Sequence, residues 1–208
     1  MPSLPGWSTV ARLPFRPMRA ADEMHRSLAG ARNLPAFGIF FLLSSLLFCL
    51  YAAHRVWERI PEGTFLAGLA VIASALLIGT FLYVVLADIL SDVLQRRRLI
   101  FPLLLSTFAI SGMFSLLGAA VYEAGVLGLW KVKRAMAIGL AATALWQGAV
   151  ETVNLRRVYG LRWWWAATVE LVARAAGIAM GLFFMGFMSG TTRPWKHWRA
   201  VLWVFGLN

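Results

Sequence analysis

A carboxylate and a guanidinium stand four residues apart inside one of the most apolar stretches of this chain. Glu170 and Arg174 lie within the run from Trp163 to Met188, and on a helix this spacing places both side chains on one face. Arg174 is about 11 residues into the run, roughly 16 Å along a helix and near the middle of a hydrocarbon core about 30 Å thick. A charge at that depth costs about 2.5–3.5 kcal/mol. We therefore predict that the two residues form an intramembrane charge pair.

Such a pair has two possible roles, a step in a proton path or a clamp that orients one helix against another. A path needs further acids, and Glu151 and Asp88, at the ends of two other apolar runs, are the candidates for a polar relay. A clamp is favoured by Ala173, Gly177 and Gly181, which recur every four residues and allow two membrane helices to approach closely. We predict the clamp and keep the relay as its alternative.

Other chemistry-bearing motifs are absent from the sequence. His25, His54 and His197 do not form a pair inside the apolar runs, where a bis-histidine haem would need them. The sequence has no HExxH, no zinc-spaced Cys/His set and no glycine-rich phosphate or dinucleotide motif. Cys49 is the lone cysteine and lies in an apolar run, so we interpret it as a packing residue. We expect no catalytic residue, no metal ligand and no enzymatic activity.

The composition indicates a protein dissolved in lipid. Hydrophobic residues make up 60% of the 208 residues and charged residues 14%, against about 45–50% and 25% in soluble domains. The net charge is +11, but the basic residues form short clusters between apolar runs, where lipid headgroups are contacted. Many of the ten tryptophans flank the same runs, as at a membrane–water boundary. We therefore do not expect nucleic acid as a partner.

The apolar runs predict an all-α integral membrane protein with about five transmembrane helices. The spans cover residues 34–54, 64–90, 100–122, 135–153 and 163–188, within a transmembrane domain at 34–190. The third run continues past Tyr122, and we predict a bend there through Gly125 and Gly128. Basic clusters follow spans two to five, so the positive-inside rule does not fix the orientation, although an N-terminus inside fits the first two loops.

The two ends of the chain are predicted to lie along the membrane surface. Residues 1–33 are rich in arginine and amphipathic, in the style of an organellar targeting segment. We expect a helix there from about Met18 to Ala31, preceded by irregular chain because of Pro14 and Pro17. Residues 191–208 form a basic, aromatic interfacial tail that is too short to span.

Anionic phospholipid is the one bound molecule that we expect, with cardiolipin as an example. Clusters of basic residues beside a membrane span attract anionic headgroups. The residues that would form such a site are Arg96, Arg97, Arg98, Trp130, Lys131 and Lys133.

These features favour a non-catalytic accessory subunit of a larger membrane complex, whose partners are the other membrane subunits. Basic aromatic edges and an arginine-rich N-terminus favour an energy-converting membrane with a respiratory chain or ATP synthase, with the mitochondrial inner membrane ahead of a bacterial inner membrane. The alternative is a small transporter or channel that uses the intramembrane Glu and Arg residues.

A third hypothesis comes from the stretch LWQGAVETVNLRRVYGLRWWWA, Leu145 to Ala166. In its layout it resembles the last loop of the five-span Yip1-type membrane proteins, where a polar helix end and a short glycine loop precede the final span. The similarity covers about a tenth of the chain. It implies a membrane trafficking or scaffold protein with a cytosolic partner.

Overall fold

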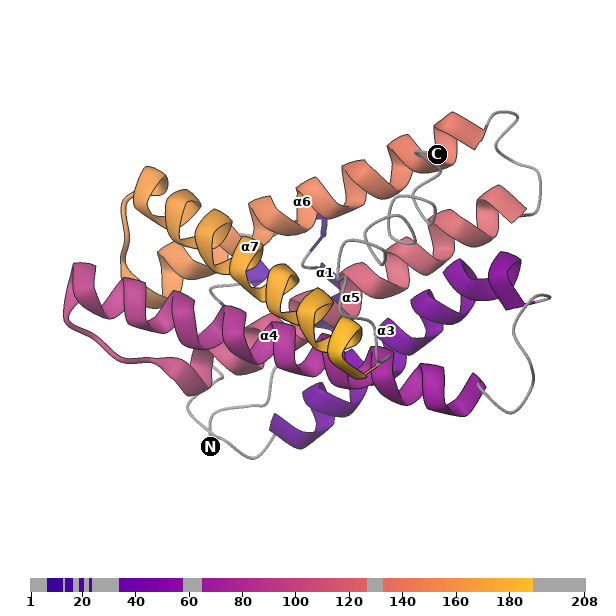
Figure 1. The fold of residues 1–208 in the computed structure, drawn as a ribbon. Helices are drawn as coiled ribbons and strands as arrows, with labels where there is room; N and C mark the ends of the chain where they lie inside the picture. The colour runs from indigo at the N-terminus through magenta and orange to yellow at the C-terminus, as the bar shows by residue number, and fades with distance from the viewer. Residues whose placement is uncertain are drawn as a thin grey trace.

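The computed structural model describes a bundle of helices (Figure 1). It describes residues 7–12, 14–16, 19, 20, 23, 34–57, 65–126 and 133–188. The helices in these ranges are α1 (Trp7–Arg12), α3 (Leu34–Trp57), α4 (Phe65–Gln95), α5 (Ile100–Val126), α6 (Lys133–Tyr159) and α7 (Trp163–Met188). No strand occurs in the described part of the chain.

Three of these helices are long and apolar enough to cross a membrane. They contain the candidate spans Ala73–Gln95 of α4, Ile100–Ala124 of α5 and Trp163–Phe184 of α7. In α3, the described residues provide a shorter apolar segment, Pro35–Phe48. The protein is therefore all-helical with a membrane-embedded character, which agrees with the predicted fold class at this coarser level.

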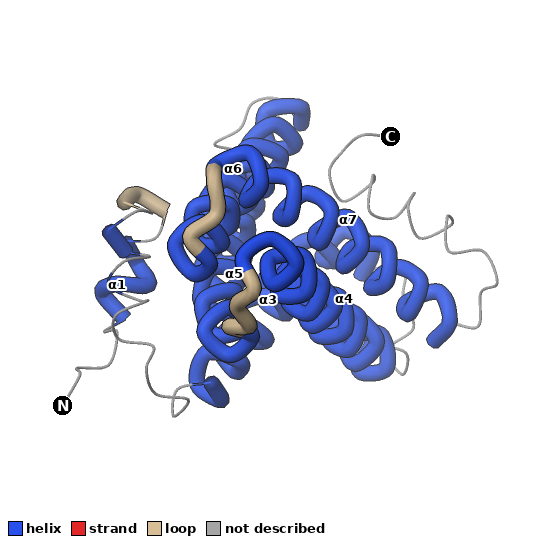
Figure 2. Tube along the Cα trace, turned by 90° about the vertical axis from the view of Figure 1, so that its left-hand side faces the viewer, coloured by secondary structure: helices blue, strands red, loops and turns tan. Residues whose placement is uncertain are grey.

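The long helices pack in two layers. Helices α4 and α7 pair with each other in front, and α3, α5 and α6 lie behind them (Figure 1), which a view from one end also shows (Figure 2). Helix α5 packs along both α3 and α6, and α6 also contacts α7. The central position of α5 explains its burial, since every residue from Leu103 to Ile110 is buried.

The bundle has an apolar core and an apolar surface. Inside, the rings of Phe41 from α3 and Phe108 from α5 stack with their centroids 5.3 Å apart. Large apolar side chains on the outer faces of α4 and α7 are exposed, for example Val93 at 76% and Phe187 at 72%. Many exposed large apolar side chains are unfavourable in water but favourable in contact with lipid. The pattern therefore agrees with a membrane environment.

Several predicted helix boundaries differ from the observed ones. Helix α5 continues through Gly125 to Val126, so the predicted bend does not begin after Tyr122. Helix α6 extends to Tyr159, six residues beyond the predicted span, and Asn154, Val158 and Tyr159 in its last turns are buried against neighbouring helices. Helix α4 likewise extends to Gln95, and Asp88 and Ser91 in its last turns are buried.

Helices α4 and α6 end in the same way. Arg96 and Gly160 follow them with positive φ angles of 54° and 71°, and their amides donate to the carbonyls of Asp92 and Arg156. This is the left-handed residue that closes many helices, and glycine adopts it without strain. Each helix is followed by a short turn, residues 96–99 and 160–162.

The N-terminal segment packs against the middle of the bundle. Val10 and Ala20 are buried in the same core as the long helices, and the indole N–H of Trp146 on α6 donates to the carbonyl of Pro14 at 2.7 Å. The irregular chain expected before Met18 is wrong for Trp7–Arg12, which form α1, because this helix ends two residues before Pro14 and is not broken by it. Residues 14–16 are not helical. Most of the helix expected at 18–31, and the tail at 191–208, lie outside the described residues.

Candidate functional site

Glu170 and Arg174 form a salt bridge on α7, with the Nε of Arg174 donating to Oε1 of Glu170. The Glu170 side chain is 7% exposed and the Arg174 side chain 28%. The guanidinium also lies over the ring of Tyr83 on α4, 5.4 Å from its centroid, a distance at which a cation is attracted by the aromatic face. The pair therefore faces α4 and the interior of the bundle.

Helix α6 supplies a third charged group at the same place. Glu151 is fully buried and interacts electrostatically with both Arg174 and Glu170. Gly148, one turn earlier on α6, lies beside the Glu170 carboxylate, since a Cβ there would make an ordinary contact 3.5 Å from its Oε1. We call Glu151, Glu170 and Arg174 the charge cluster, in which the guanidinium is bonded to Glu170 and lies within electrostatic range of Glu151.

Neutral polar groups continue from the charge cluster into the contact between α5 and α6. The amide of Asn154 donates to the Ser106 hydroxyl at 2.9 Å and to Glu151 Oε2 at 3.4 Å. Two turns earlier on α6, Gln147 donates to Ser111 at 3.1 Å. Hydrogen bonds between membrane helices each contribute about 0.6 kcal/mol and up to about 2 kcal/mol, so these pairs fix the register of α5 and α6.

Two polar atoms beside the charge cluster have no hydrogen bond to a described residue. They are Oε1 of Glu151 and the hydroxyl of Tyr83, both fully enclosed. Buried polar groups of this kind are ordinarily satisfied by water. The charge cluster can therefore do two things chemically: it can hold three helices together, and it can bind water beside a buried carboxyl group.

Asp88 lies in a separate hydrogen-bonded group, away from the charge cluster. Its Oδ1 accepts the hydroxyl of Tyr159 at 2.5 Å and the backbone amide of Leu99 at 2.9 Å. Burial, together with the hydrogen bond and the charge of Asp88, raises the pKa of Tyr159 above its ordinary value. These are the partners that the structure gives Asp88, and Glu151 is not one of them, so the geometry provides no contact for a relay between the two acids.

The small residues of α7 pack against α4. The Cβ positions of Gly177 and Gly181 would lie 2.6 Å and 3.1 Å from the carbonyl oxygens of Gly79 and Ala75. Ala173, one turn earlier, is fully buried. A close helix contact of this type needs small residues on both sides.

The sequence of α4 carries a pattern that matches this contact. Ala75 and Gly79 of α4 are also four residues apart, and Tyr83 follows after another four. The spacing is the same as that of Ala173, Gly177 and Gly181, so the two helices that meet in the structure carry matching patterns.

The two basic clusters predicted to form anionic-lipid sites lie at opposite ends of α5. Arg96, Arg97 and Arg98 precede α5, whereas Lys133 begins α6 after α5 has ended. The 27 residues of α5 separate the two ends by about 40 Å. Trp130 and Lys131 lie outside the described residues. The two clusters are therefore too far apart to share one headgroup, and the binding of anionic lipid by either cluster stays a prediction.

Within the residues that the structure describes, no group of three or more His, Cys, Asp and Glu side chains could hold a metal ion. Comparison with known proteins found no match to the chain among protein-family models, curated proteins or solved structures.

Proposed function

We propose that the protein is a non-catalytic accessory subunit of a larger membrane complex, and that it crosses the membrane five times. In this proposal α3 and α6 are spans in addition to the three apolar helices, because both are long enough to cross a membrane. Helix α6 is the least apolar of the five. A helix of that kind is stable in a membrane when protein covers it.

The observation that carries the proposal is the position of the N-terminal segment. Trp146, whose indole N–H donates to the Pro14 carbonyl, is the midpoint of α6. The N-terminal segment around Pro14 therefore lies at mid-height on the bundle. Among the described residues of the segment, the exposed basic side chains are Arg12, Arg16 and Arg19.

Each exposed arginine at mid-height would cost about 2.5–3.5 kcal/mol against hydrocarbon. Another subunit with polar or acidic groups on this face removes that cost. Because the segment packs on its own chain, its ordered structure alone does not require a partner. The exposed arginines at mid-height are the reason for proposing one.

The charge cluster supports the same proposal as a structural device. Arg174 has Glu170, Glu151 and the Tyr83 ring as partners from three different helices. Paired charges of this kind orient helices against one another. In this arrangement the guanidinium interacts with protein groups rather than with lipid.

An energy-converting membrane, first the mitochondrial inner membrane, is the location that we propose. It is supported by the arginine-rich N-terminal segment and by the basic, aromatic helix ends. Both features suit a membrane rich in anionic lipid.

The experiment is native mass spectrometry of the tagged chain, extracted from its own membrane in a mild detergent. The proposal predicts a particle larger than the 23.1 kDa chain, with at least one other polypeptide in fixed stoichiometry. A particle that contains this chain alone, with bound lipid, would contradict it.

A small transporter is the second candidate, because Glu151 Oε1 and the Tyr83 hydroxyl are enclosed without a described partner. It predicts proton or ion flux in vesicles that contain the purified chain. Glu151→Gln and Glu170→Gln should abolish this flux, while an exposed control change, Ala175→Leu, should not. Equal flux in all the variants would exclude the charge cluster as the path.

A further inference from the structure

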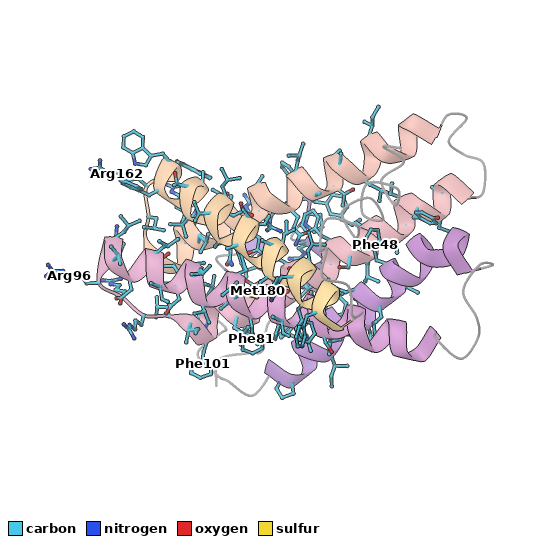
Figure 3. All side chains as sticks on the ribbon, in the orientation of Figure 1. Phe48, Phe81, Arg96, Phe101, Arg162 and Met180 are labelled. Carbon is cyan, nitrogen blue, oxygen red and sulfur yellow. The ribbon has the colours of Figure 1, made fainter. Side chains whose placement is uncertain are left out.

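The turns after α4 and α6 are held together by one carboxylate. Asp88 accepts hydrogen bonds from the amide of Leu99, at the end of the first turn, and from the hydroxyl of Tyr159, the last residue of α6 before the second turn. The two turns are 60 residues apart in sequence, but through Asp88 they form one end of the bundle. The labelled side chains of Arg96 and Arg162 project from this same end in Figure 3.

This end carries a strong positive charge. Its arginines are Arg96, Arg97, Arg98, Arg156, Arg157 and Arg162. The carboxylates near them are Asp88, which is buried, and Asp92. Asp92 is bound to Arg98 at 3.0 Å, and that hydrogen bond raises the pKa of the Arg98 guanidinium. We call this set of six arginines the basic end.

Tryptophans line the border between the basic end and the apolar surface. Trp163, Trp164 and Trp165 begin α7 and are 46%, 64% and 46% exposed. The guanidinium of Arg156 lies 4.5 Å from the centroid of Trp163, a contact that fixes a cation beside an indole. Exposed indoles at this level mark the headgroup region of a bilayer.

Large apolar side chains continue directly from these groups. Ile89 and Val93 of α4, Phe101 of α5 and Leu171 of α7 are all about half exposed or more. A molecule that fits the whole surface has an anionic head for the arginines and an apolar body for the helices.

We propose that the basic end is a binding surface for the headgroups of anionic phospholipids, with the phosphate held by the arginines of the two turns and the acyl chains against α4 and α7. The planar guanidinium binds phosphate oxygens in pairs, which favours arginine at such a site. Free phosphate would use only the charged half of the surface. The inference is independent of the proposed subunit role.

The test uses the full-length purified chain and equal amounts of phosphatidylglycerol and phosphatidylcholine in native mass spectrometry. The test variant is Arg96→Gln/Arg97→Gln/Arg162→Gln. It omits Arg98 and Arg156, which have partners within the chain. The matched control removes three exposed charges from the N-terminal segment, as Arg12→Gln/Arg16→Gln/Arg19→Gln.

The proposal predicts that the wild type and the control retain phosphatidylglycerol in preference to phosphatidylcholine. The test variant should lose this preference, with a decrease in anionic-lipid affinity of roughly tenfold or more. A variant that replaces the same three arginines by lysine should keep most of it. Equal loss in the test and control variants would overturn the proposal, because net charge alone would then explain binding. Displacement of the lipid by an equal concentration of inorganic phosphate would overturn it too.

Discussion

The Tyr159 hydroxyl and the Asp88 carboxylate form a 2.5 Å hydrogen bond between α6 and α4. Both side chains are buried. We expect Tyr159→Phe to lower the free energy of unfolding by about 1–3 kcal/mol, because Asp88 loses a donor that water cannot replace. The measurement is reversible unfolding in mixed detergent micelles.

Tyr83→Phe is the matched control. It removes a hydroxyl that has no described hydrogen-bond partner, and it keeps the ring under Arg174. Its stability should be close to that of the wild type. Equal losses of unfolding free energy in Tyr159→Phe and Tyr83→Phe would contradict a stabilising role of the hydrogen bond between Tyr159 and Asp88.

The charge cluster predicts unequal effects of single substitutions. Arg174→Met leaves two carboxyl groups buried without their guanidinium and should cost about 3–5 kcal/mol. Glu170→Gln should cost less, because Glu151 still interacts with Arg174. Unfolding in micelles measures both.

Recovery of stability distinguishes a cluster of three groups from a simple pair. If the three groups act together, Glu170→Gln/Arg174→Met should recover little stability, since Glu151 remains buried. Adding Glu151→Gln should recover most of it, because a neutral set has no unpaired charge. Full recovery in the double variant would show that Glu151 is energetically separate.

The contact between α4 and α7 predicts that Gly177→Ala is destabilising. The added methyl would meet the carbonyl oxygen of Gly79 at 2.6 Å, and backbone cannot move aside as a side chain can. We expect a loss of about 1–3 kcal/mol. Gly38→Ala in α3 is the control, with its nearest neighbour at 3.6 Å, and it should be neutral or stabilising by up to about 1 kcal/mol. A neutral Gly177→Ala would mean that the helices are further apart in the membrane.

The basic end predicts the orientation of the protein. Short arginine-rich loops stay on the inner side of a membrane, so Arg97→Cys and Arg162→Cys, made in a Cys49→Ser chain, should both be inaccessible to an impermeant thiol reagent from outside. Opening the membrane should make both reactive. Labelling of the two positions from opposite sides would contradict the arrangement of the turns.

The sequence alone was sufficient to predict helices and the polar groups on α7. The apolar runs are long enough that their period and composition identify helices, and the four-residue spacing of Glu170 and Arg174 places them on one face. The spacing of Gly177 and Gly181 predicts a close contact in the same way. These features depend on residues within one helix.

Contacts between helices could not be predicted from the same patterns. That Glu151 faces Arg174, or that Asp88 receives Tyr159, depends on how α4, α6 and α7 are arranged, and each acid had several possible partners. The sequence also left open whether Arg98 and Lys133 share a face, and the structure separates them by the length of α5. The basic end combines turns that are close only in the folded chain.

Site-specific photo-crosslinking in the native membrane tests the proposed subunit role most directly. A photoreactive residue in place of Arg16, which is exposed and follows Pro14 by two residues, should give one discrete adduct with another polypeptide. The same residue in place of Ala175, on the exposed face of α7, should react with lipid. Lipid adducts alone at both positions, or no adduct at position 16, would contradict the proposal that another subunit covers this face.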